Sequence, residues 1–510
     1  MELELRKEQF DCYRPGTQII STREETAETI VPDYCPDVAR IIECSSCLLL
    51  RDRSVKDGSA LLTGSVKLTL LYMGEDATSP RSLEYAVPFE HSEKLPEGCD
   101  RLVAEGRVCS VETRLLNPRK LYTRLELEWK LTPYCSTTLT VCGEIADQRG
   151  YSIQTLCEKR DISLVRCVSD KDFVFQDEIT IPSGRDPIAE LLCSRVKLRV
   201  TEAKSVGSKV ILKGNACVSL LYLSPDDKIC SYAEELPFSQ ILDGVAAEET
   251  GDYSVSVAAA LSGVEIHTAG DGAKQRTVNV KLLLHASVVL RENKSVDCIV
   301  DLYSTSHELN AKMESVELWQ EPEITTLTQN VREQLDTGTD VRCVLDADVC
   351  FASAGTSRAG SRVSAQAAAI LSLLFLDESG SLCSLARRIE INAETECNSE
   401  TQAIVENVYA GDISANINAA GVELRFPAEF TLVSVSAPQC DCLVSLSAEE
   451  PNHADGGAPS LVLRALRKDE TLWNVAKQYR TTVEEILSAN ELADGALPEI
   501  GRMLLIPRKR

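Results

Sequence analysis

The sequence predicts a mainly β protein, with three repeated β-sandwich-like domains followed by a small strand–helix–helix–strand domain. Three observations lead to this fold class. Apolar and polar residues alternate along most of the chain, which is typical of half-buried strands. Three segments spaced about 150 residues apart resemble one another. Helical spacing of apolar residues appears within residues 469–492 and is scarce elsewhere, so we expect at most one short helix per repeat, near residues 36–43 in the first.

Length and charge limit the class of protein. A chain of 510 residues is too long for one ordinary domain. Its net charge of −25 argues against binding to nucleic acid, which requires clustered Lys and Arg. Residues 461–510 carry a net charge of +2 and the rest of the chain −27, so the C-terminal segment is electrostatically distinct. The N-terminus lacks the apolar stretch of a signal peptide and no apolar run is long enough to span a bilayer, so we expect a cytoplasmic protein.

The repeats share an anchor motif, which reads LTLLY in the first, VSLLY in the second and LSLLF in the third. It ends in an aromatic residue: Tyr72, Tyr222 and Phe375. Eight positions before that residue lie two glycines and an alanine: Gly64, Gly214 and Ala367. A Pro-Phe pair follows in the first two repeats only, at 88–89 and 237–238. This agreement in spacing, order and residue type predicts three copies of one unit.

Each unit is expected to consist of short strands joined by acidic or Gly/Pro-containing turns. Alternation is clear at Val66, Leu68 and Leu70, and again over residues 124–129. A unit of about 150 residues is large enough to bury its own core, which predicts independent domains arranged like beads on a string. The predicted repeats are residues 1–155, 156–305 and 306–446, followed by a linker at 447–460 and a C-terminal domain at 461–510.

The usual catalytic motifs are missing from the sequence. It contains no phosphate-binding GxxxxGK[ST] loop, no GxGxxG, no HExxH and no GxSxG. None of the five histidines recurs at an equivalent position of the repeats, and the acidic pair Asp226-Asp227 fits a solvated turn. We therefore predict a protein that is not an enzyme, with no catalytic residues, no cofactor and no metal site.

The chain contains twenty cysteines, which are scattered along its length. Without an export signal a secreted disulfide framework is not expected, and most of them fit the role of small buried hydrophobes. Cys44 and Cys47 form a CxxC pair, and Cys440 and Cys442 form a CxC pair. A zinc or redox role for either pair stays open as an alternative, as does cross-linking of exposed cysteines.

The C-terminal segment follows a different pattern. Residues 461–466 read as a strand, and Thr471 is placed to cap a helix whose apolar stripe runs from Leu472 to Tyr479 at helical spacing. Thr482 and Glu485 form a capping box at the start of a second helix. Residues 503–507 then read as a closing strand.

This order closely resembles the LysM module, on the stretches DETLWNVAKQY, TTVEEILSAN and GRMLLIP. The resemblance implies a shallow groove for N-acetylglucosamine-containing glycans between two loops. By position the groove would be lined by Asp469, Glu470, Thr471, Leu472, Glu491, Leu492, Ala493 and Asp494. Asp469 stands where the family commonly has glycine, which adds a charge to the sugar-facing loop. Trp473 and Tyr479 are expected to be core residues, because their spacing is helical.

The combination of β-rich repeats with one C-terminal LysM resembles the SipL-type spore-coat morphogenetic proteins, whose repeat is the SPOCS domain. Segments such as IVPDYCPDVARIIECSS (30–46) and IVDLYSTSHELNAKMESVEL (299–318) carry the likeness. The resemblance implies a scaffold at the forespore surface and spore coat, in the mother-cell cytoplasm. It would tether the coat basement layer by binding a spore-coat morphogenetic ATPase or another coat protein. The competing hypotheses are a binder of peptidoglycan or related glycan in cell wall or cortex, and a hydrolase targeted by the LysM.

Overall fold

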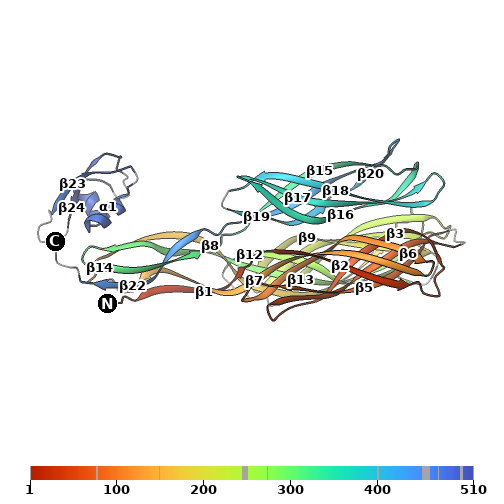
Figure 1. The fold of residues 1–510 in the computed structure, drawn as a ribbon, viewed down its shortest axis with the longest axis horizontal. Coiled ribbons are helices and arrows are strands. Elements are labelled where there is room, and N and C mark those ends of the chain that lie inside the picture. The colour runs from red at the N-terminus through yellow and green to blue at the C-terminus, as the bar shows by residue number, and fades with distance from the viewer. Residues whose placement is uncertain are drawn as a thin grey trace.

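The computed structural model confirms a mainly β fold (Figure 1). It describes residues 2–508 except 76–78, 147, 149, 244–250, 271, 273, 399–400, 451–459, 469 and 494–497. Each predicted repeat contains an antiparallel three-stranded sheet whose central strand holds the anchor motif. These sheets are β3 (Val38–Lys56), β4 (Ser59–Gly74) and β5 (Arg81–Lys94); β9 (Glu190–Val206), β10 (Lys209–Leu223) and β11 (Ile229–Leu242); and β16 (Val341–Ala359), β17 (Arg362–Asp377) and β18 (Leu382–Glu396).

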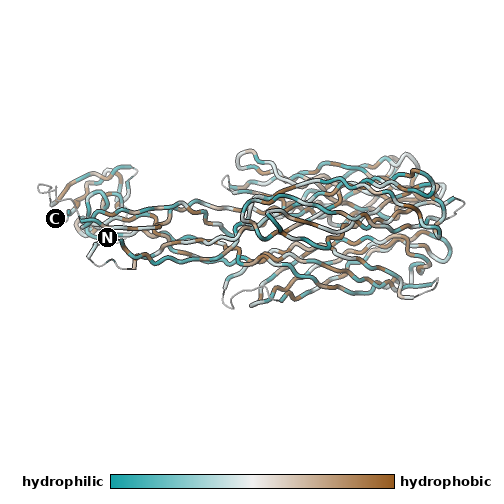
Figure 2. Tube along the Cα trace, turned by 60° about the horizontal axis from the view of Figure 1, so that its bottom comes forward, coloured by the Kyte–Doolittle hydropathy of each residue, from teal (hydrophilic) through white to brown (hydrophobic). Residues whose placement is uncertain are grey.

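A second layer of strands covers each of these sheets and completes a sandwich. The strands of this layer are β2 (Ile19–Ile30), β6 (Cys99–Asn117) and β7 (Lys120–Ile145); β8 (Ile153–Thr180), β12 (Asp252–Thr268) and β13 (Thr277–Ser304); and β15 (Glu323–Leu335), β19 (Gln402–Ala410), β20 (Ser414–Asn418) and β21 (Gly421–Val435). Apolar residues from both layers fill each sandwich. Figure 2 shows the hydrophilic and hydrophobic residues alternating along these strands, as a half-buried sheet requires.

The first two sandwiches explain why glycine and phenylalanine recur together. Gly64 pairs with Phe89 across β4 and β5, and a Cβ on Gly64 would lie 2.7 Å from the Phe89 ring. Gly214 pairs with Phe238 in the same way, and its Cβ would lie 2.5 Å from that ring. The third sandwich has Ala367 opposite an isoleucine, so the glycine and the phenylalanine are replaced together. Tyr72 and Tyr222 are fully buried, and their hydroxyls donate to loop carbonyls.

Two expectations were wrong. Residues 36–43 form no helix, because β3 begins at Val38 and its strand geometry places Ile41 against one apolar cluster and Ile42 in another. The sandwiches are also not independent beads. They share an apolar cluster to which each contributes: Ile42, Leu71, Leu192, Leu221, Leu223, Leu374 and Leu382. The leucine before each anchor aromatic points into this cluster, whereas its neighbours on either side point into the sandwich core.

A charged cluster borders the shared apolar cluster. Arg195 of β9 forms ion pairs with Glu43 of β3 and with Asp346 and Asp348 of β16, so that one guanidinium contacts all three sandwiches. Burial alone would lower the pKa of Arg195, but the neighbouring carboxylates outweigh it and the pKa is raised. The guanidinium is therefore held in its charged form between the sandwiches.

Several strands continue past the sandwiches and form a narrow extension, which we call the stalk (Figure 1). It consists of three antiparallel pairs: β1 (Leu5–Pro15) with residues 134–145 of β7, residues 153–165 of β8 with 291–304 of β13, and β14 (Glu308–Glu317) with β22 (Gln439–Glu449). All three pairs contribute to its apolar interior, for example through Ile145, Ile299 and Leu443. The predicted boundary at 155/156 falls inside β8, and that at 305/306 directly follows β13. The domain boundaries themselves stay predictions.

The C-terminal domain consists of β23 (Leu461–Ala465), α1 (Leu472–Tyr479), α2 (Val483–Ala489) and β24 (Met503–Pro507). Of the predicted linker, residues 451–459 lie outside the described residues, and β22 occupies 447–449. Neither α1 nor α2 has the length and apolar character needed to cross a membrane, and the described part of the chain contains no other helix that does. A disulfide joins Cys99 of β6 to Cys135 of β7.

Candidate functional site

The capping residues define the two helices of the C-terminal domain as predicted. The Thr471 side chain accepts a hydrogen bond from the backbone N–H of Asn474, 3.2 Å away, at the start of α1. Thr482 and Glu485 form the expected reciprocal capping box at the start of α2. Both interactions satisfy backbone N–H groups that have no partner within a helix, so the short helices begin at fixed positions.

Asn490, just after α2, was missed by the sequence reasoning. Its side-chain nitrogen donates to the carbonyls of Ile486 and Leu505, both at 2.7 Å. Its side-chain oxygen accepts from the backbone N–H of Leu505, also at 2.7 Å. The residue therefore ties the end of α2 to β24 and sets where the following loop leaves the domain.

The first loop of the predicted groove is largely occupied with structural contacts. Asp469 lies outside the described residues. Glu470 is half-buried, and its carboxylate accepts from the Arg464 guanidinium at 2.6 Å. Thr471 caps α1, and Leu472 is buried in the core of the domain. Of the described residues of this loop, Thr471 is the one that is exposed to solvent.

The second loop of the predicted groove is more accessible. Glu491 and Ala493 are exposed, whereas Leu492 packs against the core of the domain. Asp494 lies outside the described residues. The assignment of these two loops as a binding groove stays a prediction.

Helix α1 is seated on the end of the stalk, an arrangement that sequence reasoning did not predict. The Trp473 indole N–H donates to the Asp301 carboxylate of β13 at 2.7 Å, and its ring meets the Tyr303 ring edge-on at 4.9 Å between centroids. The Tyr303 hydroxyl donates to the carbonyl of Thr481 at 2.8 Å. Trp473 and Tyr479 pack against the core of the C-terminal domain, as expected, and Trp473 also bridges this core and the stalk.

Ion pairs extend this seat along α1. Lys477 pairs with Asp301, and Arg480 pairs with Glu308 at 3.2 Å. Burial would raise the pKa of Asp301, but hydrogen bonds from Lys477 and Trp473 outweigh it and hold the pKa below its ordinary value. The seat therefore joins cationic residues of the C-terminal segment to acidic residues of the stalk. This agrees with the positive net charge of residues 461–510 and the negative net charge of the rest of the chain.

The outer face of the two-stranded sheet is exposed and apolar. Leu461 and Leu463 of β23 and Met503 of β24 have 52%, 62% and 52% of their surface exposed. Their neighbours Val462 and Leu504 point into the core. Strands that are apolar on both faces indicate a second contact surface, and this signal was already present in the sequence.

Comparison with protein families identifies two parts of the chain. Residues 466–507 match the LysM domain, and residues 187–267 match the SipL SPOCS domain. No curated protein matches the chain. The two matches confirm the resemblance to SipL-type proteins. The LysM match indicates glycan or peptidoglycan binding, the SPOCS match indicates a role in sporulation, and both families are non-catalytic in kind.

Proposed function

We propose that this chain is a non-enzymatic scaffold of endospore-coat assembly in the mother-cell cytoplasm. It tethers the basement layer of the coat to the forespore surface through protein–protein contacts. The observation that carries this proposal is the LysM domain fixed by α1 to the end of the stalk, within a chain that also matches SPOCS. The seat leaves the outer face of β23 and β24 exposed, with apolar side chains suited to a protein partner.

The proposed partner is a spore-coat morphogenetic ATPase or another coat protein that contacts Leu463 and Met503. A fluorescent fusion of the full chain is expected to form a ring around the forespore. The double variant L463D/M503D should become diffuse, because two buried charges oppose docking. Ser488→Asp, at an exposed position on α2, is the matched control and should keep the ring. When the wild-type fusion is pulled down from sporulating cells, mass spectrometry of the proteins that bind it should identify a coat or forespore-surface protein. A diffuse wild-type fusion, or a ring that both variants keep, contradicts the proposal.

A glycan-binding function is the second candidate, favoured by the LysM match and by the exposure of Glu491 and Ala493. It places the chain on peptidoglycan or another N-acetylglucosamine-containing glycan of cell wall or cortex. Titration of the full chain with N-acetylglucosamine oligomers should then saturate, and Ala493→Arg should weaken binding about tenfold or more by blocking the loop. A flat titration of the wild-type chain removes this candidate.

A further inference from the structure

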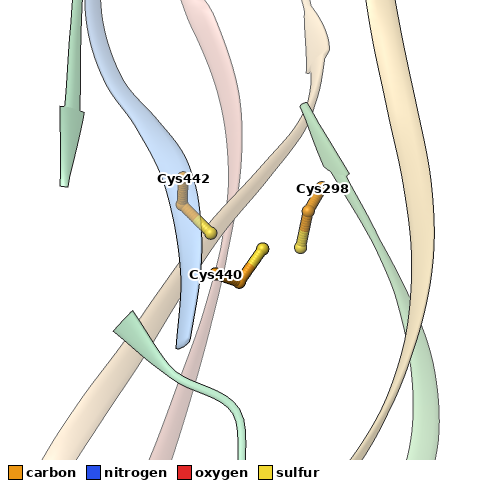
Figure 3. A group of neighbouring side chains, drawn as sticks. All are labelled: Cys298, Cys440 and Cys442. Atoms are coloured by element: carbon orange, nitrogen blue, oxygen red, sulfur yellow. The ribbon is translucent and has the colours of Figure 1, made fainter. Parts of the chain in front are cut away.

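The stalk brings a third cysteine beside the CxC pair. Cys440 and Cys442 lie two positions apart on β22, so their side chains leave the same face of the strand. Cys298 comes from β13, about 140 positions earlier in the sequence. The three sulfur atoms lie within 4.8 Å of one another, and Figure 3 shows them gathered around a common space.

We propose that Cys298, Cys440 and Cys442 form a binding site for a thiophilic metal ion, Zn²⁺ or Cu⁺, inside the stalk. Thiolate sulfur is the ligand type that selects these two ions over harder cations such as Mg²⁺ or Ca²⁺. Zn–S bonds of about 2.3 Å at tetrahedral angles place sulfur atoms about 3.8 Å apart. The three side chains therefore need to close in by no more than about 1 Å to bind an ion.

The surroundings favour a small, tightly held ion over a solvated one. The three residues are 0%, 5% and 2% exposed, and the cluster around them is apolar, with Ile162, Leu164 and Val296. Such a site suits a soft ion with sulfur ligands, and Zn²⁺ better than Cu⁺, because three thiolates leave a net charge of −1 with Zn²⁺ and −2 with Cu⁺ where water has little access. None of the three cysteines is in a disulfide. On binding, each thiol loses its proton to solvent and forms one metal–sulfur bond.

The ion would join two of the three strand pairs of the stalk. Cys298 belongs to the pair of β8 and β13, and the CxC residues belong to the pair of β14 and β22. No backbone ladder runs between these two pairs among the described strands. A metal ion would supply a direct link between them within the apolar interior of the stalk.

The test uses the full chain, reduced and stripped of metal with a chelator. The chain is then titrated separately with Zn²⁺ and with Cu⁺ buffered by a competing ligand, and bound metal is measured after gel filtration. We expect one equivalent of at least one ion in the wild type and an affinity loss of at least 100-fold in Cys298→Ser and Cys442→Ser. Cys157→Ser, at an exposed cysteine, and Cys44→Ser, in the CxxC pair, are matched controls that should keep the ion.

X-ray absorption on the metal-loaded wild type gives a second readout that needs no variant to fold. Three sulfur neighbours at about 2.3 Å are expected around the ion. The proposal is overturned if the wild type retains neither ion, if fewer than three sulfur atoms surround it, or if Cys298→Ser binds like the wild type. It is also overturned if peptide mapping of the purified chain before reduction finds a disulfide within the trio. The test measures binding by the purified chain, so its outcome is independent of the proposed sporulation role.

Discussion

At the scale of single residues, Gly64 is a position where the backbone requires the absence of a side chain. A Cβ there would lie 2.1 Å from the carbonyl oxygen of Leu49 and 2.7 Å from the Phe89 ring. Gly64→Ala should therefore destabilise the chain by about 1–3 kcal/mol, measured by urea unfolding, because neither the backbone nor a packed ring can move freely. Gly184→Ala is the control, since a Cβ there meets nothing within 4 Å, and its unfolding midpoint should stay unchanged.

Arg195 links the three sandwiches through its ion pairs, so its loss should weaken their packing. Replacing it with methionine keeps the stem but leaves Glu43, Asp346 and Asp348 close together without their shared cation. About 20% of the Arg195 side chain is exposed. We therefore expect the free energy of unfolding, measured in urea, to fall by an amount on the order of 3 kcal/mol, which is the lower end of the range for breaking a buried ion pair. Arg6→Met breaks an exposed pair with Glu144 and should cost less than about 1 kcal/mol. Equal losses in the two variants would contradict a shared role for Arg195.

At the scale of elements, the contact between α1 and β13 is testable through Asp301. Asp301→Ala removes the acceptor of both Trp473 and Lys477, so hydrogen exchange in α1 should rise while exchange in the sandwiches stays the same. Glu314→Ala, on the exposed face of β14, is the control and should leave α1 protected. The contact lowers the pKa of Asp301. The stability that the Asp301 carboxylate contributes is therefore complete above its ordinary pKa of about 3.9 and is lost as the pH falls through the lowered pKa. Protection of α1 that is unchanged in the variant would rule out this seat.

The elements also show how far the sequence alone could lead. The sandwiches and the LysM domain were predictable because alternation, capping residues and the anchor motif are local signals. The stalk was not, because β7 and β13 pass from a sandwich into the stalk as single strands of 26 and 28 residues. The packing of the sandwiches did leave a signal. Two consecutive buried leucines, such as Leu220 and Leu221, indicate a strand covered on both faces. Asp301 and Cys298 carry no local signal, because their partners lie more than 140 positions away.

At the scale of the whole molecule, the long stalk separates the LysM domain from the sandwiches (Figure 1). A compact chain of 510 residues would have a radius of gyration of about 24 Å. Small-angle X-ray scattering should give a value clearly above this, with a distance distribution that has a long tail, because the stalk adds length but little mass.

The tail of the distance distribution should persist in 0.5 M salt if the stalk's apolar interior keeps the stalk straight, since screening weakens exposed ion pairs but not apolar packing. Asp301→Ala should broaden the end of the tail and leave its main peak unchanged, because only the LysM domain gains freedom. A radius near 24 Å would mean that the stalk folds back, and the LysM domain would then lie beside the sandwiches, with no separation for a tether to bridge.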